Sequence, residues 1–269
     1  MGCILMLKTR VFTALLGIPV LLFFVYLGNY WFTLFILLVT LIGLKEYNTL
    51  MRKGDWKPFE IAGYLMIPIL FFAVYQDSAP LLISLWILFF LTFSLLPVFF
   101  YGRVKYWDSA LAFWGIIYTG GLAGFLLATR MLPDGFYYIL FILIVIWSND
   151  IFAYLWGSRF GRRKLAPAIS PKKTVEGTIA GLVASVLAGM ALGILLPVEL
   201  ISLTTGARLG LLTGVTGSLG DLSQSALKRS VGAKDSGDLL PGHGGILDRF
   251  DSLFFAAPFF YIYLRYFMI

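Results

Sequence analysis

Nine long apolar stretches limit what this chain can fold into more than any other feature. They cover about residues 11–27, 30–50, 59–76, 79–101, 106–128, 134–157, 174–197, 207–227 and 250–268. A bilayer core takes roughly 20 apolar residues per helix, and 59% of this chain is hydrophobic while only 13% is charged. We therefore predict an all-α, polytopic integral membrane protein with about nine transmembrane helices.

The stretches leave little room for a soluble domain, and no repeat or linker divides the chain. The sequence predicts a single transmembrane domain over 1–269, with N-terminal helices to about residue 130 and catalytic helices and cytoplasmic loops over about 134–269. Lys8 and Arg10 precede the first stretch, which resembles a signal peptide but lacks a small-residue cleavage site at its end. We expect an uncleaved helix there.

The basic residues are distributed unevenly between the two sides that nine helices would create. Of the 21 lysines and arginines, 18 fall at the N-terminus and in the even-numbered connections, whereas Arg130, Arg208 and Arg265 fall on the other side. Cytoplasmic loops carry the excess of positive charge. We therefore expect a cytoplasmic N-terminus, an external C-terminus and a place in the cell inner (plasma) membrane.

Some acids lie where a membrane protein seldom places them. Asp221 falls within the eighth apolar stretch, and Asp248 and Asp251 lie at the start of the helix that we expect over the ninth. An ionisable residue in a span is a functional hypothesis by default, although Asp221 can also form an internal salt bridge, and Asp248 and Asp251 can cap a helix. Neighbouring helices would bring Asp221 and Asp248 together around Mg²⁺, which takes one or two carboxylates and shares its remaining positions with phosphates and water.

The connection between the last two stretches combines cations with a glycine-rich turn. It carries Lys228, Arg229, Lys234 and Arg249, the acid Asp235, and the turn that contains His243, Gly244 and Gly245. Such a turn lets backbone N–H groups approach a phosphate, and the cations would surround a polyanion. A belt of cations for lipid headgroups is the alternative, and His243 is either a general base or, more simply, scaffold.

A second set of polar residues surrounds the connection 157–173. Asn149 and Asp150 end one stretch, and Ser170, Lys172, Lys173, Thr174 and Glu176 introduce the next. Ser170 or Thr174 can serve as a helix cap, but a cap does not account for the lysine pair, which we expect to bind phosphates. The glycines at 210, 214, 217 and 220 are more simply explained by close helix packing.

These motifs together resemble a known family. The pattern Ser225-x-Leu227-Lys228-Arg229-x4-Lys234-Asp235-x-Gly237-x2-Leu240-Pro241-x-His243-Gly244-Gly245-Ile246-x-Asp248-Arg249-x-Asp251 matches the signature of the phosphatidate cytidylyltransferases (CDP-diacylglycerol synthases) without a departure. Asn149-Asp150-x2-Ala153-Tyr154-x2-Gly157-x3-Gly161 and Ser170-Pro171-Lys172-Lys173-Thr174-x-Glu176-Gly177 resemble two further blocks of that family. The first five stretches resemble it only in being hydrophobic.

The resemblance implies transfer of a cytidylyl group from CTP to phosphatidate at the cytoplasmic membrane face, which yields CDP-diacylglycerol and pyrophosphate. It implies a Mg²⁺ site at Asp221 and Asp248, allows a second, monovalent cation such as K⁺, and implies a homodimer among membrane lipids. No nucleic acid partner is expected. Lys172, Lys173, Lys228, Arg229 and Lys234 would hold phosphates, Asp235 and His243 would orient the loop or the nucleotide, and Asp150 and Asp251 are secondary metal candidates.

Two other functions fit parts of the sequence. A transporter for an anionic solute would also have intramembrane acids and broken helices, but its polar groups would lie near the midplane and often recur in both halves. A CDP-alcohol phosphotransferase would show an Asp-Gly followed by paired acids, whereas Phe and two Tyr follow Asp134-Gly135 here. A purely structural membrane protein would hardly need the acids.

Overall fold

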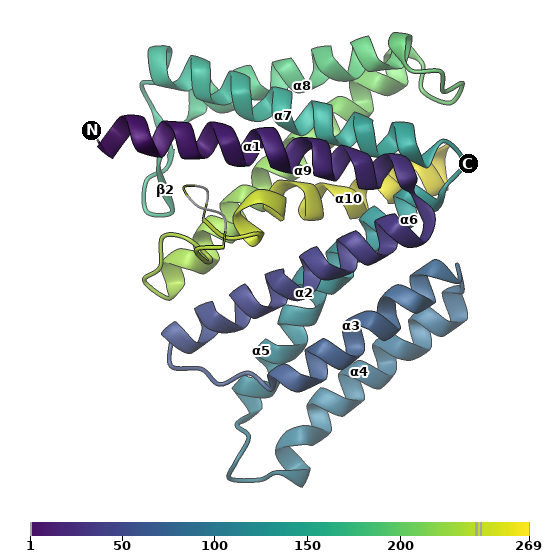
Figure 1. Ribbon diagram of the computed structural model, residues 1–269, viewed down its shortest axis with the longest axis vertical. Coiled ribbons are helices and arrows are strands. Elements are labelled where there is room, and N and C mark those ends of the chain that lie inside the picture. Colours follow the sequence, from purple (N-terminus) through teal and green to yellow (C-terminus); the bar gives the residue numbers. More distant parts are fainter. Residues whose placement is uncertain (1, 240–241, 243, 269) are drawn as a thin grey trace. The chain divides into compact units, whose positions relative to one another are not determined.

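The computed structural model describes the backbone of residues 2–239, 242 and 244–268, with side chains from residue 15 onward. Its elements, in chain order, are α1 (Gly2–Leu27), α2 (Asn29–Lys53), α3 (Glu60–Tyr75), α4 (Ala79–Phe99), α5 (Tyr106–Ile116), the π-helical turn η1 (Ile117–Gly121), α6 (Leu122–Met131), α7 (Gly135–Phe160), β1 (Lys164–Ala166), β2 (Ser170–Thr174), α8 (Val175–Leu195), α9 (Leu203–Ser230) and α10 (Leu247–Phe267) (Figure 1).

Every predicted apolar stretch is helical in the structure, with α5, η1 and α6 forming one continuous helix over the fifth. Among the described residues, five helices are long and apolar enough to cross a membrane: Asn29–Lys53, Ala79–Phe99, Tyr106–Met131, Gly135–Phe160 and Val175–Leu195. Two shorter apolar helices cover Leu15–Leu27 and Glu60–Tyr75. The protein is therefore mostly helical and suited to cross a membrane several times. The prediction of helices alone omits one feature, the antiparallel hairpin of β1 and β2.

The chain forms two compact units. The first consists of Met1–Met131 with Ser230–Arg249, and the second of Leu132–Arg229 with Phe250–Ile269. The division near residue 131 lies close to the predicted change from N-terminal to catalytic helices. However, residues 230–249, which contain most of the signature and are called the signature loop below, group with the N-terminal helices. The single domain remains a prediction.

The first unit is built around α2, which packs against α3, α5 and α6. Tyr47 of α2 is fully buried, and its hydroxyl donates to the carbonyl oxygen of Leu111 at 3.0 Å. The wide turn η1 contains Gly120, which packs closely against α3. A Cβ at Gly120 would lie 2.8 Å from Ile67 Cγ1. Turns of this kind disturb a helix locally without ending it, so the fifth apolar stretch remains one helix.

The second unit depends on glycines for close helix contact. Figure 1 shows α7 and α8 side by side, and a Cβ at Gly177 of α8 would lie 2.9 Å from the Cα of Gly157 on α7. On α9, a Cβ at Gly210 would lie 3.3 Å from the Cα of Gly189 on α8. Small residues let backbones approach in this way where there is no hydrophobic force between helices in lipid.

The predicted role of the glycine stripe on α9 is confirmed along its length. A Cβ at Gly214 would lie against Ser185 of α8. A Cβ at Gly217 would lie 3.6 Å from Ser252 Cβ of α10, and one at Gly220 would lie 2.8 Å from the Asp251 carbonyl oxygen. Through its glycines α9 is therefore placed between α8 and α10. This packing sets the position of the acids that follow.

Candidate functional site

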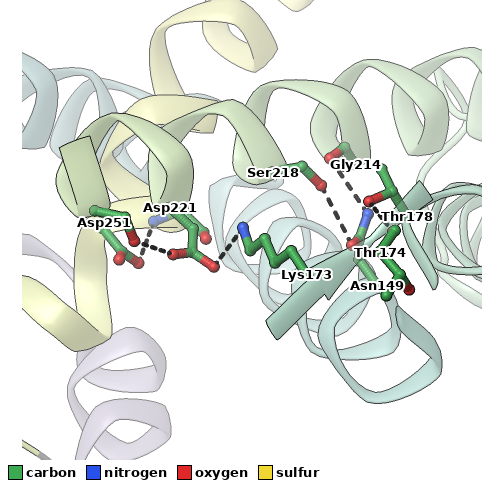
Figure 2. Close-up of polar contacts among 10 residues, drawn as sticks. Asn149, Lys173, Thr174, Thr178, Gly214, Ser218, Asp221 and Asp251 are labelled. Carbon is green, nitrogen blue, oxygen red and sulfur yellow. Dashed lines mark hydrogen bonds and ion pairs between the residues drawn. The ribbon is translucent and has the colours of Figure 1, made fainter. Parts of the chain in front are cut away.

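The amide of Asn149 ties three helices of the second unit together. Its Nδ2 donates to Ser185 Oγ on α8 at 2.9 Å and to the Gly214 carbonyl oxygen on α9 at 3.2 Å. Its Oδ1 accepts from Ser218 Oγ at 3.4 Å (Figure 2). Asn149 is only 5% exposed, and satisfied buried amides usually serve to fix packing. The structure gives Asn149 this scaffold role, and its predicted contact with substrate stays a prediction.

The hairpin between α7 and α8 presents the predicted lysine pair. β1 and β2 pair Lys164 with Thr174 and Ala166 with Ser170. Thr174 caps α8, because its side chain accepts from Gly177 N at 3.2 Å. The cap reading is therefore confirmed for Thr174, whereas Ser170 lies at the start of β2.

Glu176 closes the base of the same hairpin. Its carboxylate accepts from the backbone N–H groups of Arg162 at 3.0 Å and Arg163 at 3.2 Å. A carboxylate in the first turn of a helix is also favoured by the helix dipole. Glu176 therefore holds the basic connection against α8, and nothing in these contacts requires it to meet substrate.

Lys173 and Asp221 form the central ion pair of the site. Lys173 Nζ lies 2.8 Å from Asp221 Oδ2, and the two side chains are 27% and 35% exposed. Ser225, one turn further along α9, donates to Asp221 Oδ1 at 3.3 Å. The salt bridge that was an alternative reading of Asp221 therefore exists, and its partner is one of the predicted phosphate-binding lysines. Lys172, its neighbour on β2, is exposed.

Asp251 lies beside Asp221, as Figure 2 shows. A Cβ at Gly220 would clash with the Asp251 carbonyl oxygen at 2.8 Å, so α9 and α10 approach each other closely at this level. The Asp251 carboxylate interacts electrostatically with those of Asp221 and, more weakly, Asp150, and with the ammonium of Lys228. Two adjacent carboxylates repel each other unless a cation lies close. Lys173, 2.8 Å from Asp221, is one such cation, and the oxygens of the pair also suit a metal ion.

Oxygen ligands of this kind fit Mg²⁺. No group of three or more His, Cys, Asp or Glu side chains with metal-binding geometry occurs among the described residues. Mg²⁺ does not require such a group, since it commonly takes one or two carboxylates and fills its shell with substrate phosphates and water. The donors at Asp221 and Asp251 are consistent with that mode of binding.

The signature loop of the first unit is organised by Asp248. Its Oδ2 accepts from Ser236 N at 2.8 Å, from Ser236 Oγ at 3.0 Å and from Gly245 N at 3.1 Å. The sequence predicted that N–H groups of this turn bind a phosphate. In the structure, the N–H of Gly245 donates to the Asp248 carboxylate instead. Gly244, with φ of +82°, uses a backbone conformation that favours glycine.

The remaining cations and the histidine are placed as follows. Arg229 Nε donates to the Ile169 carbonyl oxygen at 3.3 Å, which links α9 to the loop between β1 and β2. Lys234, Asp235 and Arg249 are exposed. His243 lies outside the described residues. In the second unit, Lys173 pairs with Asp221, and Asp251 interacts with Asp221, Lys228 and Asp150.

The predicted partnership of Asp221 with Asp248 joins residues of different units, the second and the first. It stays a prediction. Glu46 of α2, whose carboxylate contacts the signature loop, was not among the residues predicted from the sequence. An acid within an apolar stretch was the signal that could have found it.

Comparisons with known proteins agree on one family. The model of the cytidylyltransferase family matches residues 8–267. The chain is 36% identical to the phosphatidate cytidylyltransferase of Bacillus subtilis over 97% of its length and 98% of that protein. It is 36% identical to the phosphatidate cytidylyltransferase of Staphylococcus saprophyticus over 96% of its length and 98% of that protein. It is also 37% identical to the uncharacterized protein YnbB of Escherichia coli, over 89% of its length and 81% of that protein.

Proposed function

Since this chain belongs to the cytidylyltransferase family, we propose that it transfers the cytidylyl group of CTP to phosphatidate for phospholipid biosynthesis. The products are CDP-diacylglycerol and pyrophosphate. The observation that carries this function is the similarity to bacterial phosphatidate cytidylyltransferases along almost the whole of both chains. The protein is a nucleotidyltransferase.

An isotope experiment tests the assignment. Purified protein in detergent is given phosphatidate and CTP labelled at either the α- or the γ-phosphorus, and the label is then extracted into organic solvent. We expect the α-label to enter the lipid phase and the γ-label to stay in water as pyrophosphate. Label from both positions in the lipid, or from neither, would exclude cytidylyl transfer.

The reaction is an in-line displacement at the α-phosphorus of CTP. A phosphatidate oxygen forms the new P–O bond while the bond from the α-phosphorus to the bridging oxygen of the β-phosphate breaks, and pyrophosphate leaves. A phosphomonoester has a second pKa of about 6 and is largely dianionic at pH 7, so the attacking oxygen needs no general base. The protein has instead to bring two polyanions together and stabilise the leaving group.

The lysines and arginines of the site serve that purpose. Lys172 and Lys173 on β2, with Lys228, Arg229 and Lys234 at and after the end of α9, would hold the phosphates, and Asp235 and His243 would orient the loop or the nucleotide. The ion pair between Lys173 and Asp221 keeps that ammonium in place at 2.8 Å from the carboxylate. A salt bridge that pre-orients a cation lowers the cost of ordering it when substrate arrives.

Mg²⁺ would be held by Asp221 and Asp248, with Asp251 and Asp150 nearby as secondary candidates, and a monovalent cation such as K⁺ would accompany it. When bound, the divalent ion would neutralise charge on the phosphates and on the leaving pyrophosphate. Support for the site comes from the oxygen donors and from the close approach of the Asp221 and Asp251 carboxylates. The family resemblance of the signature supports the choice of Asp248.

Removing the lysine pair should mainly weaken substrate binding. In the double variant Lys172→Ala, Lys173→Ala, we expect KM to rise about 10- to 100-fold for CTP or phosphatidate, the range expected for a lost bond to a charged group. Steady-state kinetics with each substrate varied in turn measures this. Lys164→Ala, an exposed lysine of the neighbouring strand, is the matched control. An unchanged KM for both substrates would remove the lysines from the binding site.

We also propose the membrane arrangement: nine spans that include α9 and α10, a cytoplasmic N-terminus, the bacterial inner membrane, and an active site that faces the cytoplasm. The charge distribution and the helices found at all the apolar stretches support it. With Cys3 replaced by Ser, a cysteine introduced at Asp238 should react with a membrane-impermeant maleimide only after the cells are opened. Labelling of intact cells would contradict the orientation.

The enzyme is proposed to act as a homodimer. Native mass spectrometry of the detergent-solubilised protein should then give twice the chain mass, and a monomer alone would contradict the proposal.

A further inference from the structure

Glu46 is a buried acid on α2 that the chemistry of the site does not use. It is only 7% exposed. Its Oε1 accepts from Ile246 N at 2.8 Å, and its Oε2 accepts from Leu247 N at 2.9 Å and from Ser236 Oγ at 3.0 Å. A buried carboxylate is costly unless hydrogen-bonded. All three of these donors belong to the signature loop or to the start of α10.

These contacts make Glu46 a cap for α10 that is supplied by another helix. The first N–H groups of a helix have no partner within it, and the positive end of the helix dipole favours an anion there. Caps normally come from the residue just before the helix. Here the anion comes from a residue 200 positions earlier in the chain, so α2 fixes where α10 begins.

Two glycines of the signature leave space for this carboxylate. A Cβ at Gly237 would lie 2.9 Å from Glu46 Oε1 and 3.0 Å from its Cδ. A Cβ at Gly245 would clash with Glu46 Oε2 and with Ser236 Oγ. Real Cβ atoms essentially never approach so closely. A side chain at 237 or 245 would therefore displace the Glu46 carboxylate from its present position.

One of the donors to Glu46, the Ser236 hydroxyl, also contacts Asp248. Ser236 Oγ lies 3.0 Å from both Glu46 Oε2 and Asp248 Oδ2, and since a hydroxyl has a single hydrogen it can donate to only one of them at a time. Ser236 N and Gly245 N donate to Asp248 as well. Ser236 is therefore shared by the two carboxylates, and Gly245, which donates to Asp248, directly precedes Ile246, which donates to Glu46.

We infer that Glu46 is a positioning residue for cytidylyl transfer, an inference that rests on the proposed function: it holds Ser236, Ile246 and Leu247 and, through Ser236 and the neighbouring Gly245, the Asp248 carboxylate. Glu46 does not contact the substrates, because its own oxygens accept hydrogen bonds from the loop. It acts only by placing the Asp248 carboxylate. Its loss should lower kcat and leave binding of both substrates largely intact.

The test is the isosteric variant Glu46→Gln. A glutamine replaces one carboxylate oxygen by an NH₂ donor, so a backbone N–H of Ile246 or Leu247 faces a donor instead of an acceptor. We expect hydrogen–deuterium exchange in peptides over 236–248 to speed up about 10- to 100-fold, the change that loss of one hydrogen bond to a charged group corresponds to. We expect kcat to fall by a similar factor while both KM values stay within about threefold.

Two controls accompany this variant. Glu60→Gln removes a carboxylate that pairs with the Arg52 side chain at 2.5 Å in the same unit and should change neither exchange over 236–248 nor kcat. Gly237→Ala keeps Glu46 but takes the space of its carboxylate. It should show the same faster exchange and lower kcat, and it serves as the test if Glu46→Gln does not fold. Gly124→Ala, whose Cβ would meet Val74 at an ordinary 3.5 Å, is its control.

The outcomes separate the inference from the function on which it rests. If the wild type transfers the cytidylyl group but Glu46→Gln shows wild-type exchange or wild-type kcat, the positioning role is overturned and the function stands. If the wild type transfers nothing, the function fails. Faster loop exchange together with lower kcat and unchanged KM supports the inference.

Discussion

Replacing Asp248 by asparagine is expected to abolish turnover, with kcat lowered on the order of a thousandfold, while the protein stays folded and inserted in the membrane. Asparagine has the shape of aspartate, and its amide oxygen can still accept from Ser236 N and Gly245 N, the bonds that Asp248 Oδ2 makes now. The loop should therefore keep its form. What the variant loses is a negative charge and a ligand for Mg²⁺.

This result is measured as pyrophosphate release at saturating CTP and phosphatidate. Asp238→Asn, which neutralises an exposed acid of the same loop, is the matched control and should keep wild-type activity. Detergent stability and gel-filtration behaviour establish that the variant is folded. Near-normal turnover by a folded Asp248→Asn protein would remove Asp248 from the metal site.

Asp221→Asn is expected to lower kcat by at least about a hundredfold. The carboxylate has two functions in the proposed site, as a Mg²⁺ ligand and as the partner of Lys173 at 2.8 Å. The two can be separated by comparison with Lys173→Met, which removes the ion pair but keeps the carboxylate. A metal ligand predicts a larger loss for Asp221→Asn than for Lys173→Met and a higher Mg²⁺ concentration for half-maximal rate.

Glu199→Gln is the control for this variant, because Glu199 is an exposed acid of the same unit. Equal losses for Asp221→Asn and Lys173→Met, with the same Mg²⁺ dependence, would show that Asp221 serves only to hold the lysine. In that case Asp221 would not be a Mg²⁺ ligand.

Helix positions could be predicted from the sequence because hydrophobicity over roughly 20 residues is a strong local signal. The structure has a helix at each apolar stretch, and the packing role of the glycines on α9 followed from their spacing alone. The hairpin of β1 and β2 could not be predicted in this way. It is short, contains Pro171, and depends on the Thr174 cap and on Glu176 binding the backbone of Arg162 and Arg163.

The candidate site was predictable where motif residues carry charge. Asp221, Asp251, Lys173 and Lys228 were chosen from sequence and lie together in the second unit. Glu46 was missed because its role depends on a tertiary contact with residues 190 to 201 positions away. Asn149 was chosen as a substrate ligand, but its partners, Ser185 and Gly214, are on helices whose approach the sequence does not specify.

Pyrophosphate release by the purified protein decides whether it is a phosphatidate cytidylyltransferase. It is measured with CTP and phosphatidate supplied together or singly, with and without Mg²⁺, and with the other nucleoside triphosphates in place of CTP. We expect release that requires CTP, phosphatidate and Mg²⁺ together. Folded protein that releases no pyrophosphate under any of these conditions would contradict the proposed function.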